Sequence, residues 1–179
     1  KFGSAYTFDG NDYINVTTAA DFTKNFTITA WINVSSSSGD KRIISRRNSA
    51  LVQYDLFIYS LNGALSWYDG STIKSDNTNI TNSSWFFIAA ALNDTSIRFY
   101  VNGVAGATAS MGIARRAVDT LIGAWSAGTN GFFVGTIDDL VVYNRTLTAQ
   151  QILALYQNRT DLIVANELSA QQNWSACVT

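Results

Sequence analysis

The stretch Gly135–Tyr156, GTIDDLVVYNRTLTAQQILALY, reads as one strand that runs directly into one short helix. Its first part, Ile137–Tyr143, is rich in β-branched and aromatic residues, which predicts a strand. Thr148 precedes Gln151 by three residues, the spacing of a capping box at a helix N-terminus. The apolar residues that follow supply one side of a short helix. Because the rest of the chain is β-rich, a lone helix at this place restricts the possible folds.

The sequence before this stretch predicts antiparallel strands joined by turns. In Phe26–Val34 apolar and polar residues largely alternate, as expected of a strand with one buried face. The dipeptides Asn62-Gly63 and Asp69-Gly70 favour hairpin turns on either side of a short strand. Trp85–Leu92 and Ser96–Val101 predict a further pair, and the chain has no proline to interrupt them. The sequence therefore predicts an all-β fold of two packed antiparallel sheets with one short C-terminal helix.

These segments resemble, in the same order, those of the laminin-G-like and pentraxin-like domains, which are concanavalin A-like jelly-roll sandwiches. The resemblance rests on the segments FDGNDYINV, FTITAWINV, WFFIAAALNDTSIRFYVNG, LIGAW and GTIDDLVVY, and it covers roughly residues 3–157. It implies a jelly roll. Because this fold hosts lectins, adhesins, hydrolases and spacers, the resemblance does not by itself define an activity.

The chain is expected to divide into two parts. Residues 1–157 are expected to form the sandwich, and residues 158–179 a linker or the start of a following immunoglobulin-like module. Trp174–Val178 is similar to a strand of such a module, in which Cys177 would find a partner elsewhere. The segment resembles linkers of archaeal multidomain surface proteins; a tail that packs back on the sandwich is the alternative. The family pattern begins one strand before Lys1, so its first strand is expected to be missing here.

Charge and hydropathy argue against two classes of partner. The net charge is −1 and no run of basic residues is longer than a pair such as Arg115-Arg116, so no nucleic-acid footprint is expected. No run approaches the ~18 apolar residues of a membrane span. We therefore expect no membrane insertion by this domain.

The residue types that most catalysis needs are nearly absent. The chain has no histidine, and Glu167, its one glutamate, lies beyond the expected sandwich. Retaining glycosidases need two carboxyl groups about 5–5.5 Å apart, and serine or cysteine nucleophiles need an adjacent base. We therefore expect no enzyme activity, and a glycoside hydrolase is the least favoured class.

Asparagine sequons are more frequent than composition explains. A sequon needs Ser or Thr at the second position after Asn. Ser and Thr make up 36 of the 179 residues, so about three sequons are expected by chance among the 16 asparagines. Nine sequons occur. Accidental sequons in Thr- and Ser-rich strands are the alternative, but the excess favours an extracellular or cell-surface glycoprotein. The sequon residues are Asn15, Asn25, Asn33, Asn79, Asn82, Asn93, Asn144, Asn158 and Asn173.

Aromatic residues next to turns are candidates for ligand binding. Sugars place their C–H faces on planar apolar side chains and bond their hydroxyls to polar groups. Trp67 and Tyr68 precede the Asp69-Gly70 turn, and Trp125 lies in the glycine-rich stretch AWSAGTNG. For each aromatic residue the alternative is packing in the core. The expected ligand-binding residues are Trp67, Tyr68, Trp125, Arg46 and Asn48, with Arg47 and Tyr54 as neighbours.

The resemblance also implies calcium, which takes six to eight oxygen ligands. The residues after LIGAW lack the acidic pattern of the pentraxin ligand site, so a structural ion is the better match. Asp139 corresponds to the aspartate of the final strand that holds a structural calcium in glucanase relatives, and Asp9, Gly10 and Asp12 would be its neighbours. The alternative is that these residues form a turn and a strand entry.

Two functions from different classes follow. The first is a non-catalytic extracellular adhesion or recognition module that binds a glycan or a cell-surface protein. The second is a structural spacer of a cell-surface or filament protein that displays glycans. In both cases neighbouring domains of a longer chain are expected partners.

Overall fold

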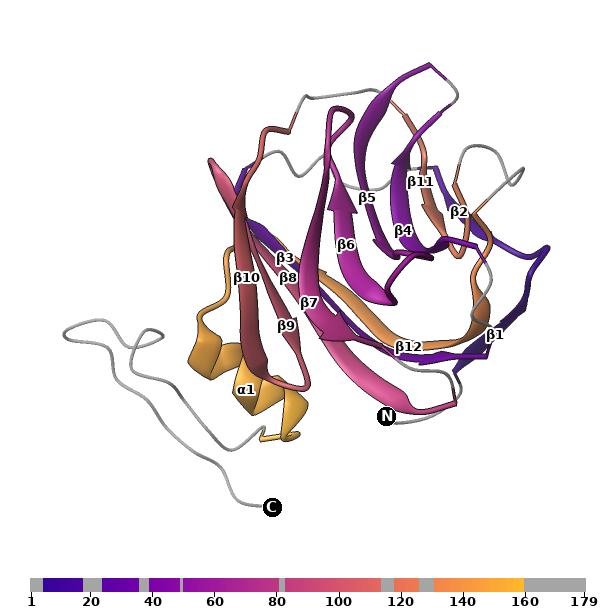
Figure 1. Cartoon of the computed structure of the whole chain (residues 1–179). Coiled ribbons are helices and arrows are strands. Elements are labelled where there is room, and N and C mark those ends of the chain that lie inside the picture. Colours follow the sequence, from indigo (N-terminus) through magenta and orange to yellow (C-terminus); the bar gives the residue numbers. More distant parts are fainter. Residues whose placement is uncertain are drawn as a thin grey trace.

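The computed structural model describes residues 5–17, 24–35, 39–48, 50–80, 83–113, 118–125 and 131–159. Within them the chain forms two six-stranded antiparallel sheets and one helix, which confirms the predicted jelly-roll sandwich (Figure 1). The predicted linker or following module lies almost entirely outside the described residues, as does Cys177.

The two sheets are built from strands far apart in the sequence. In spatial order the first sheet contains β1 (Tyr6–Asp9), β12 (Val134–Tyr143), β3 (Phe26–Val34), β8 (Trp85–Asn93), β9 (Ser96–Val101) and β10 (Val104–Ser110). The second contains β2 (Ile14–Val16), β11 (Thr120–Ile122), β4 (Lys41–Arg47), β5 (Val52–Ile58), β6 (Ala64–Tyr68) and β7 (Ile73–Asn79). The helix α1 is Ala149–Tyr156.

The core lies between the two sheets. The predicted alternation in β3 is confirmed, because Phe26, Ile28 and Ile32 point into the core. Leu56 of β5 and Trp67 of β6 face them from the second sheet, and both side chains are fully buried. Interdigitation of two apolar faces is the main source of stability in a sandwich.

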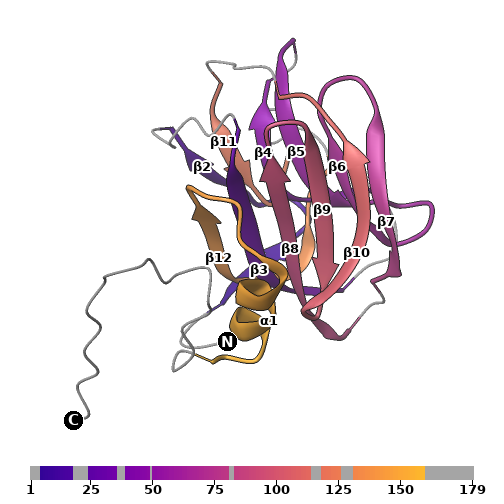
Figure 2. The same ribbon diagram turned by 90° about the vertical axis from the view of Figure 1, so that its left-hand side faces the viewer.

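Helix α1 packs on the outer face of the first sheet (Figure 2). The capping box is confirmed: the Gln151 backbone N–H donates to Thr148 Oγ1 at 3.3 Å, and the Gln151 side chain accepts from the Thr148 N–H at 2.9 Å. Ile152 is buried against Phe87 and Trp31, which lie on the side of the sheet opposite the main core. This second small cluster explains why the chain ends its last strand in a helix.

Strand β12 contains a bulge. Asp138 pairs with Trp31 and Val141 with Thr29, so β12 has one residue more than β3 over this span. Asp139 has a φ of +47°, an uncommon conformation for a residue with a side chain. Asp139 therefore lies inside the strand, as the prediction of a strand over Ile137–Tyr143 implies, and at its bulge.

Candidate ligand-binding site

The outer face of the second sheet carries an unusual group of charged residues. In β4 and β5, Ile44 pairs with Leu56 and both face the core, so the next pair, Ser45 and Asp55, faces outward. Arg42 and Arg47 of β4 lie beside Asp55 on this face, with Trp125 close to both. We call Arg42, Arg47, Asp55 and Trp125 the Arg–Trp cluster.

Ion pairs hold the cluster together. Asp55 is fully buried, and its Oδ2 lies 2.9 Å from Arg47 Nη1 and 3.5 Å from Arg42 Nε. Arg42 Nη1 also lies 3.0 Å from Asp40 Oδ2. Two guanidinium groups therefore face two carboxylates. Because an unpaired buried charge is costly, this pairing of opposite charges allows the side chains to be buried.

Hydrogen bonds keep Asp40 ionised. Burial raises the pKa of this carboxyl, but hydrogen bonds from Ser60 and from the Arg42 side chain outweigh that effect, so the pKa lies below its ordinary value of 3.8. The Ser60 backbone N–H donates to Asp40 Oδ1 at 2.9 Å. Asp40 therefore stays ionised and paired with Arg42 at neutral pH.

The two arginines stack on aromatic rings. Arg47 Cζ lies 3.8 Å from the centre of the Trp125 ring and 5.8 Å from that of Tyr68. Arg42 Cζ lies 4.0 Å from the centre of the Phe57 ring. Such cation–π contacts fix the planes of the guanidinium groups and so the direction of their N–H donors.

Several buried polar side-chain atoms among the described residues of this face make no hydrogen bond. Buried polar side-chain atoms almost always make a hydrogen bond in native proteins, so a local group of exceptions calls for an explanation. Among the described residues, the buried atoms without a hydrogen-bond partner include Arg42 Nε, Ser45 Oγ, Arg47 Nε, Asp55 Oδ1 and Trp125 Nε1. Donors and acceptors are thus mixed within one small volume, as recognition of hydroxyl groups requires.

A pocket of about 370 Å³ opens beside the cluster. It is lined by Asp40, Arg42 and Trp125 and by Gly10, Gly39 and Gly131 from three connecting segments. Gly131 has a φ of +62°, and a Cβ at this position would lie 3.2 Å from Arg42 Cγ. The glycine allows the chain to pass close to the arginine and leaves the pocket open.

The predicted ligand-binding residues do not all lie at one site in the structure. Trp125 belongs to the cluster and Tyr68 lies at its edge, both half-buried. The exposure expected of Trp67 is wrong: this side chain is fully buried and stacks on Tyr54, with ring centres 4.9 Å apart. Its register partner Leu56 faces the core, and Trp67 must therefore do the same.

Arg46 and Asn48 lie outside the cluster. Arg46 is buried, and its guanidinium donates to Gln53 Oε1 at 2.9 Å and to Thr120 Oγ1 at 3.0 Å. Asn48 is exposed, and its side-chain oxygen accepts from the backbone N–H groups of Ala50 and Leu51, which makes it a turn residue.

Sequence reasoning missed Arg42 and Asp55 as site residues. Asp55 interrupts the apolar run of β5 between Tyr54 and Leu56. A charged residue in a strand that is otherwise apolar is the signal that could have indicated a buried ion pair.

The predicted calcium ligands do not come together. Asp9 pairs with Val134, and Asp139 lies five residues further along β12, about 16 Å away at roughly 3.3 Å per residue. Asp9 Oδ1 accepts from the Asn11 N–H, and Asp12 Oδ2 accepts from the Asp9 N–H, so both carboxylates close their own turn. No group of three acidic, histidine or cysteine residues suited to a metal occurs in the described part of the chain. The four residues do not fit one calcium site, and calcium binding stays a prediction.

Most sequon residues within the described ranges are at the surface. Asn33 is half-buried, and Asn82 and Asn173 lie outside the described residues. The exposed sequon residues are Asn15, Asn25, Asn79, Asn93, Asn144 and Asn158.

The two sheets and the terminal helix form a concanavalin A-like jelly-roll domain. The chain belongs to the concanavalin A-like lectin/glucanases superfamily, whose family model matches residues 8–153. A search of the curated proteins returned no match.

Solved structures share this fold at low sequence identity. A heptameric SAP-like pentraxin from Limulus polyphemus is 19% identical with a TM-score of 0.68, covering 84% of this chain and 80% of that one. Domain 4 of the extracellular arabinanase AbnA from Geobacillus stearothermophilus, in complex with arabinotriose, is 17% identical (TM-score 0.71, 88% and 78% covered). The CBM40 of the Ruminococcus gnavus IT-sialidase, bound to α2,3 sialyllactose, is 14% identical (TM-score 0.70, 86% and 97% covered).

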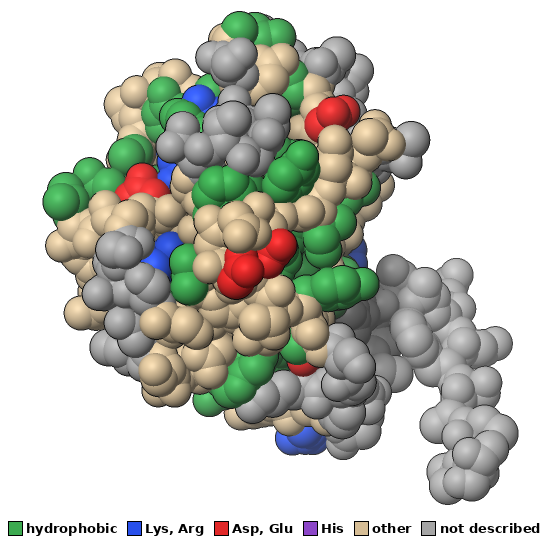
Figure 3. Space-filling model, turned by 90° about the vertical axis from the view of Figure 1, so that its right-hand side faces the viewer, with side chains coloured by type: hydrophobic (Ala, Val, Ile, Leu, Met, Phe, Trp, Pro, Cys, Tyr) green, Lys and Arg blue, Asp and Glu red, His purple; other side chains and the backbone are tan. Residues whose placement is uncertain are grey.

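Two surface properties bear on the partners. No helix in the described part of the chain is long and apolar enough to cross a membrane. On the face in Figure 3, Lys and Arg side chains are few and scattered, and the apolar side chains form small separate groups.

Proposed function

We propose that this domain is a non-catalytic module that binds a glycan at the Arg–Trp cluster. The observation that carries the proposal is the group of buried polar atoms without partners around Trp125 and the two arginines. The arabinanase domain with arabinotriose and the CBM40 with sialyllactose support a carbohydrate as the class of ligand, because both share this fold.

The chemistry of the cluster suits a sugar. The indole of Trp125 offers a planar apolar surface for the C–H groups of a sugar ring. Arg47 Nε is a donor and Asp55 Oδ1 an acceptor without a hydrogen-bond partner among the described residues, so the cluster holds both kinds of group that hydroxyls can bond. A ligand in the adjacent pocket would contact Arg42 and Trp125, which line it.

The same residues argue against catalysis at this place. A general acid that protonates a leaving group needs a raised pKa, whereas the pKa of Asp40 lies below its ordinary value and its carboxylate is paired with Arg42. Asp55 is fully buried in its ion pair with Arg47. The chain has no histidine to serve as a base.

An extracellular location is part of this proposal. Six exposed sequon residues on separate elements support N-glycosylation of the surface. Intact-mass analysis of protein from its natural source should show N-glycans on most of the nine sequons, and a bare 19.5 kDa chain from that source would contradict this.

One specific observation favours the second function, a glycan-displaying spacer. The sequon residues lie on both sheets and on the helical end, while the side chains of the cluster are mostly buried. A surface covered with glycans would leave little room for a large partner.

A glycan array with matched variants separates the two functions. The native domain should bind a defined set of glycans, and Trp125→Ala should lose that binding. Tyr6→Ala is the control, because Tyr6 is an exposed aromatic residue on the other sheet. Absence of binding by the native domain would favour the spacer, whereas equal binding by both variants would place the glycan site outside the Arg–Trp cluster.

A further inference from the structure

A second pocket, of about 360 Å³, lies on the outer face of the first sheet, beside the C-terminal end of α1. Its lining comes from β3, β8 and β12 and from the end of the helix, and includes Trp31, Phe87, Val141, Tyr143, Leu155 and Asn158. The pocket is thus separated from the main core by the sheet itself.

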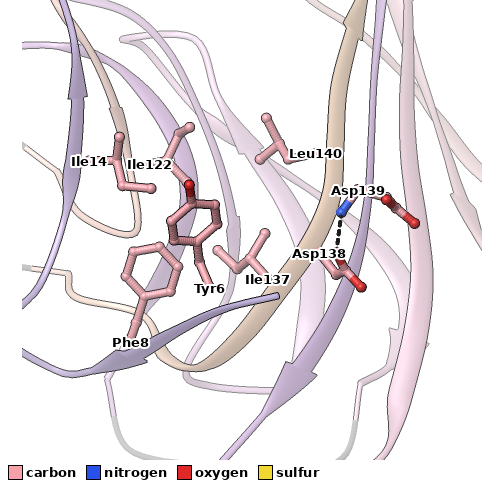
Figure 4. Close-up of a pocket in the computed structure, with 8 residues that line it drawn as sticks. All are labelled: Tyr6, Phe8, Ile14, Ile122, Ile137, Asp138, Asp139 and Leu140. Atoms are coloured by element: carbon pink, nitrogen blue, oxygen red, sulfur yellow. Dashed lines mark hydrogen bonds between the residues drawn. The ribbon is translucent and has the colours of Figure 1, made fainter. Parts of the chain in front are cut away.

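The bulge in β12 turns apolar side chains toward this pocket. Ile137 lies in the core, and strict alternation from it would send Val141 and Tyr143 inward as well. The extra residue reverses the alternation, so Leu140 packs against the core, whereas Val141 and Tyr143 line the outer pocket. Figure 4 shows Ile137 and Leu140 at the hollow between the two sheets, with the Asp139 carboxylate pointing away from them. The strand therefore presents apolar side chains on both faces of the sheet.

The outer pocket leaves large apolar side chains partly exposed. Val141 is 40% exposed, Leu155 is 36% exposed, and Trp31 is half-buried beside them. Thr29 and Asp139 add polar groups to the same lining. An apolar surface with a few polar groups next to it suits a sugar ring, which has C–H faces and hydroxyl groups at its edge.

Asn158 lines this pocket and begins the sequon Asn158–Thr160, NRT. It follows the helix C-cap Gln157 with a φ of +55°, and its backbone N–H donates to the Leu155 carbonyl at 3.1 Å. Asparagine is common at this position of a helix end, which accounts for the residue but not for the threonine two positions later. The helix end holds Asn158 beside the apolar side chains, so a sugar linked to it starts at the pocket.

We propose that Asn158 carries an N-glycan whose first sugar packs into this pocket. The apolar face of the sugar covers Val141 and Leu155, and its hydroxyl groups lie toward Asp139. Burial of this apolar surface stabilises the folded chain, so the glycan is a part of the fold. The inference rests on the glycosylated, extracellular state that belongs to the proposed function.

The attachment is made by a glycosyltransferase of the host, not by this domain. Asn158 Nδ2 forms a bond to the anomeric carbon of the sugar and loses one proton. The bond from that carbon to the phosphate of a lipid-linked sugar donor breaks, and the lipid phosphate leaves with the electron pair of that bond.

Two sequon variants, each made in two hosts, test the proposal. Thr160→Ala removes the glycan of Asn158, and Thr95→Ala removes that of Asn93, an exposed residue at the turn between β8 and β9. A eukaryotic host attaches N-acetylglucosamine as the first sugar, whereas a bacterial host leaves the sequons bare and so gives the effect of each substitution alone. After subtraction of that effect, loss of the Asn158 glycan should lower the midpoint of thermal unfolding by about 2–4 °C. Loss of the Asn93 glycan should leave the midpoint unchanged.

A second pair of variants locates the sugar. Val141→Ser makes the pocket more polar and should abolish the stabilisation that the Asn158 glycan provides. Val104→Ser is the matched control, because Val104 is a 70% exposed valine of β10 that does not line the pocket. Enzymatic trimming of the glycan to its first sugar should keep the stabilisation, since that sugar is the part that fills the pocket.

Three results would overturn the proposal. Site-specific mass spectrometry that finds Asn158 bare, in a chain glycosylated at its other sequons, would show that the sequon is not used. Equal midpoints with and without the Asn158 glycan would show that the sugar covers no apolar surface. Stabilisation that survives Val141→Ser would place its origin outside the pocket. Each of these results leaves the binding of a free glycan at the Arg–Trp cluster untouched, and failure of that binding would not alter these measurements.

Discussion

The carboxylate of Asp76 fills the space in which a side chain at Gly106 would begin. A Cβ at Gly106 would lie 2.0 Å from Asp76 Oδ1, and the neighbouring Ala107 N–H donates to that oxygen at 2.8 Å. Asp76 belongs to β7 and Gly106 to β10, so this contact joins the two sheets along the side where their last strands meet. The sandwich is closed there by one buried carboxylate.

Replacement of Gly106 should therefore destabilise the domain. Gly106→Ala forces Asp76 out of its hydrogen bond and should lower the free energy of unfolding by about 1–3 kcal/mol. Gly112→Ala is the control, because a Cβ there meets nothing within 4 Å. Urea unfolding of both variants measures the difference, and equal midpoints would contradict the role given to Asp76.

Asp76 should also make stability depend on pH. Burial raises its pKa, but hydrogen bonds from the Ala107 backbone, Thr78 and the Asn77 backbone outweigh this and bring the pKa below 3.8. A carboxyl with a lowered folded-state pKa stabilises the fold above its unfolded-state pKa, and this stabilisation is lost as pH falls through the folded-state value. Stability should thus decrease below about pH 4, with a shallower decrease in Asp76→Asn. Denaturation at a series of pH values between about 2.5 and 7 tests this.

Substitution of Trp67 and of Trp125 by alanine should lower the stability of the domain by very different amounts. Trp67→Ala removes a fully buried ring from the core and should cost about 3–5 kcal/mol. Trp125→Ala should cost clearly less, since its ring is half-buried on the outer face. Chemical denaturation of both variants decides the matter, and a larger loss for Trp125 would reverse the assignment of core and site.

The buried Asp55 should contribute far more to the free energy of unfolding than an exposed aspartate in a similar ion pair does. Asp55→Ala leaves Arg42 and Arg47 buried without their shared partner and should cost about 3–5 kcal/mol. In the control, Asp94→Ala breaks the exposed pair with Lys24, whose side chains are 62% and 68% exposed, and should cost about 0–1 kcal/mol. Similar losses in the two variants would show that the cluster is open to solvent.

Thermal unfolding in the presence of calcium tests the predicted structural ion. If Asp139 binds a structural calcium, millimolar calcium should raise the midpoint of thermal unfolding, because a ligand specific to the folded state stabilises it. Asp139→Ala should abolish the rise. Asp9→Ala should leave it unchanged, because the register separates Asp9 from Asp139. Identical unfolding curves in calcium and in chelator would remove the ion from this domain.

Local patterns of the sequence were enough to predict most of the elements. The alternation in Phe26–Val34 marked a half-buried strand, and the spacing of Thr148 and Gln151 marked the start of the helix. Both signals depend on neighbours along the chain, since a strand repeats every two residues and a helix cap spans one turn. The family resemblance then implied the jelly roll, while the order of the strands within each sheet comes from the structure.

Only the tertiary structure decided which face each side chain occupies. Trp67 and Tyr68 are adjacent, and alternation states that they point in opposite directions, but the pairing of Trp67 with Leu56 determines which one is buried. In the same way Asp55 and Arg47 meet because β4 pairs with β5, and Trp125 joins them from a distant part of the chain. The physical reason is that periodicity is a property of one strand, whereas register and packing depend on contacts between residues far apart in the sequence.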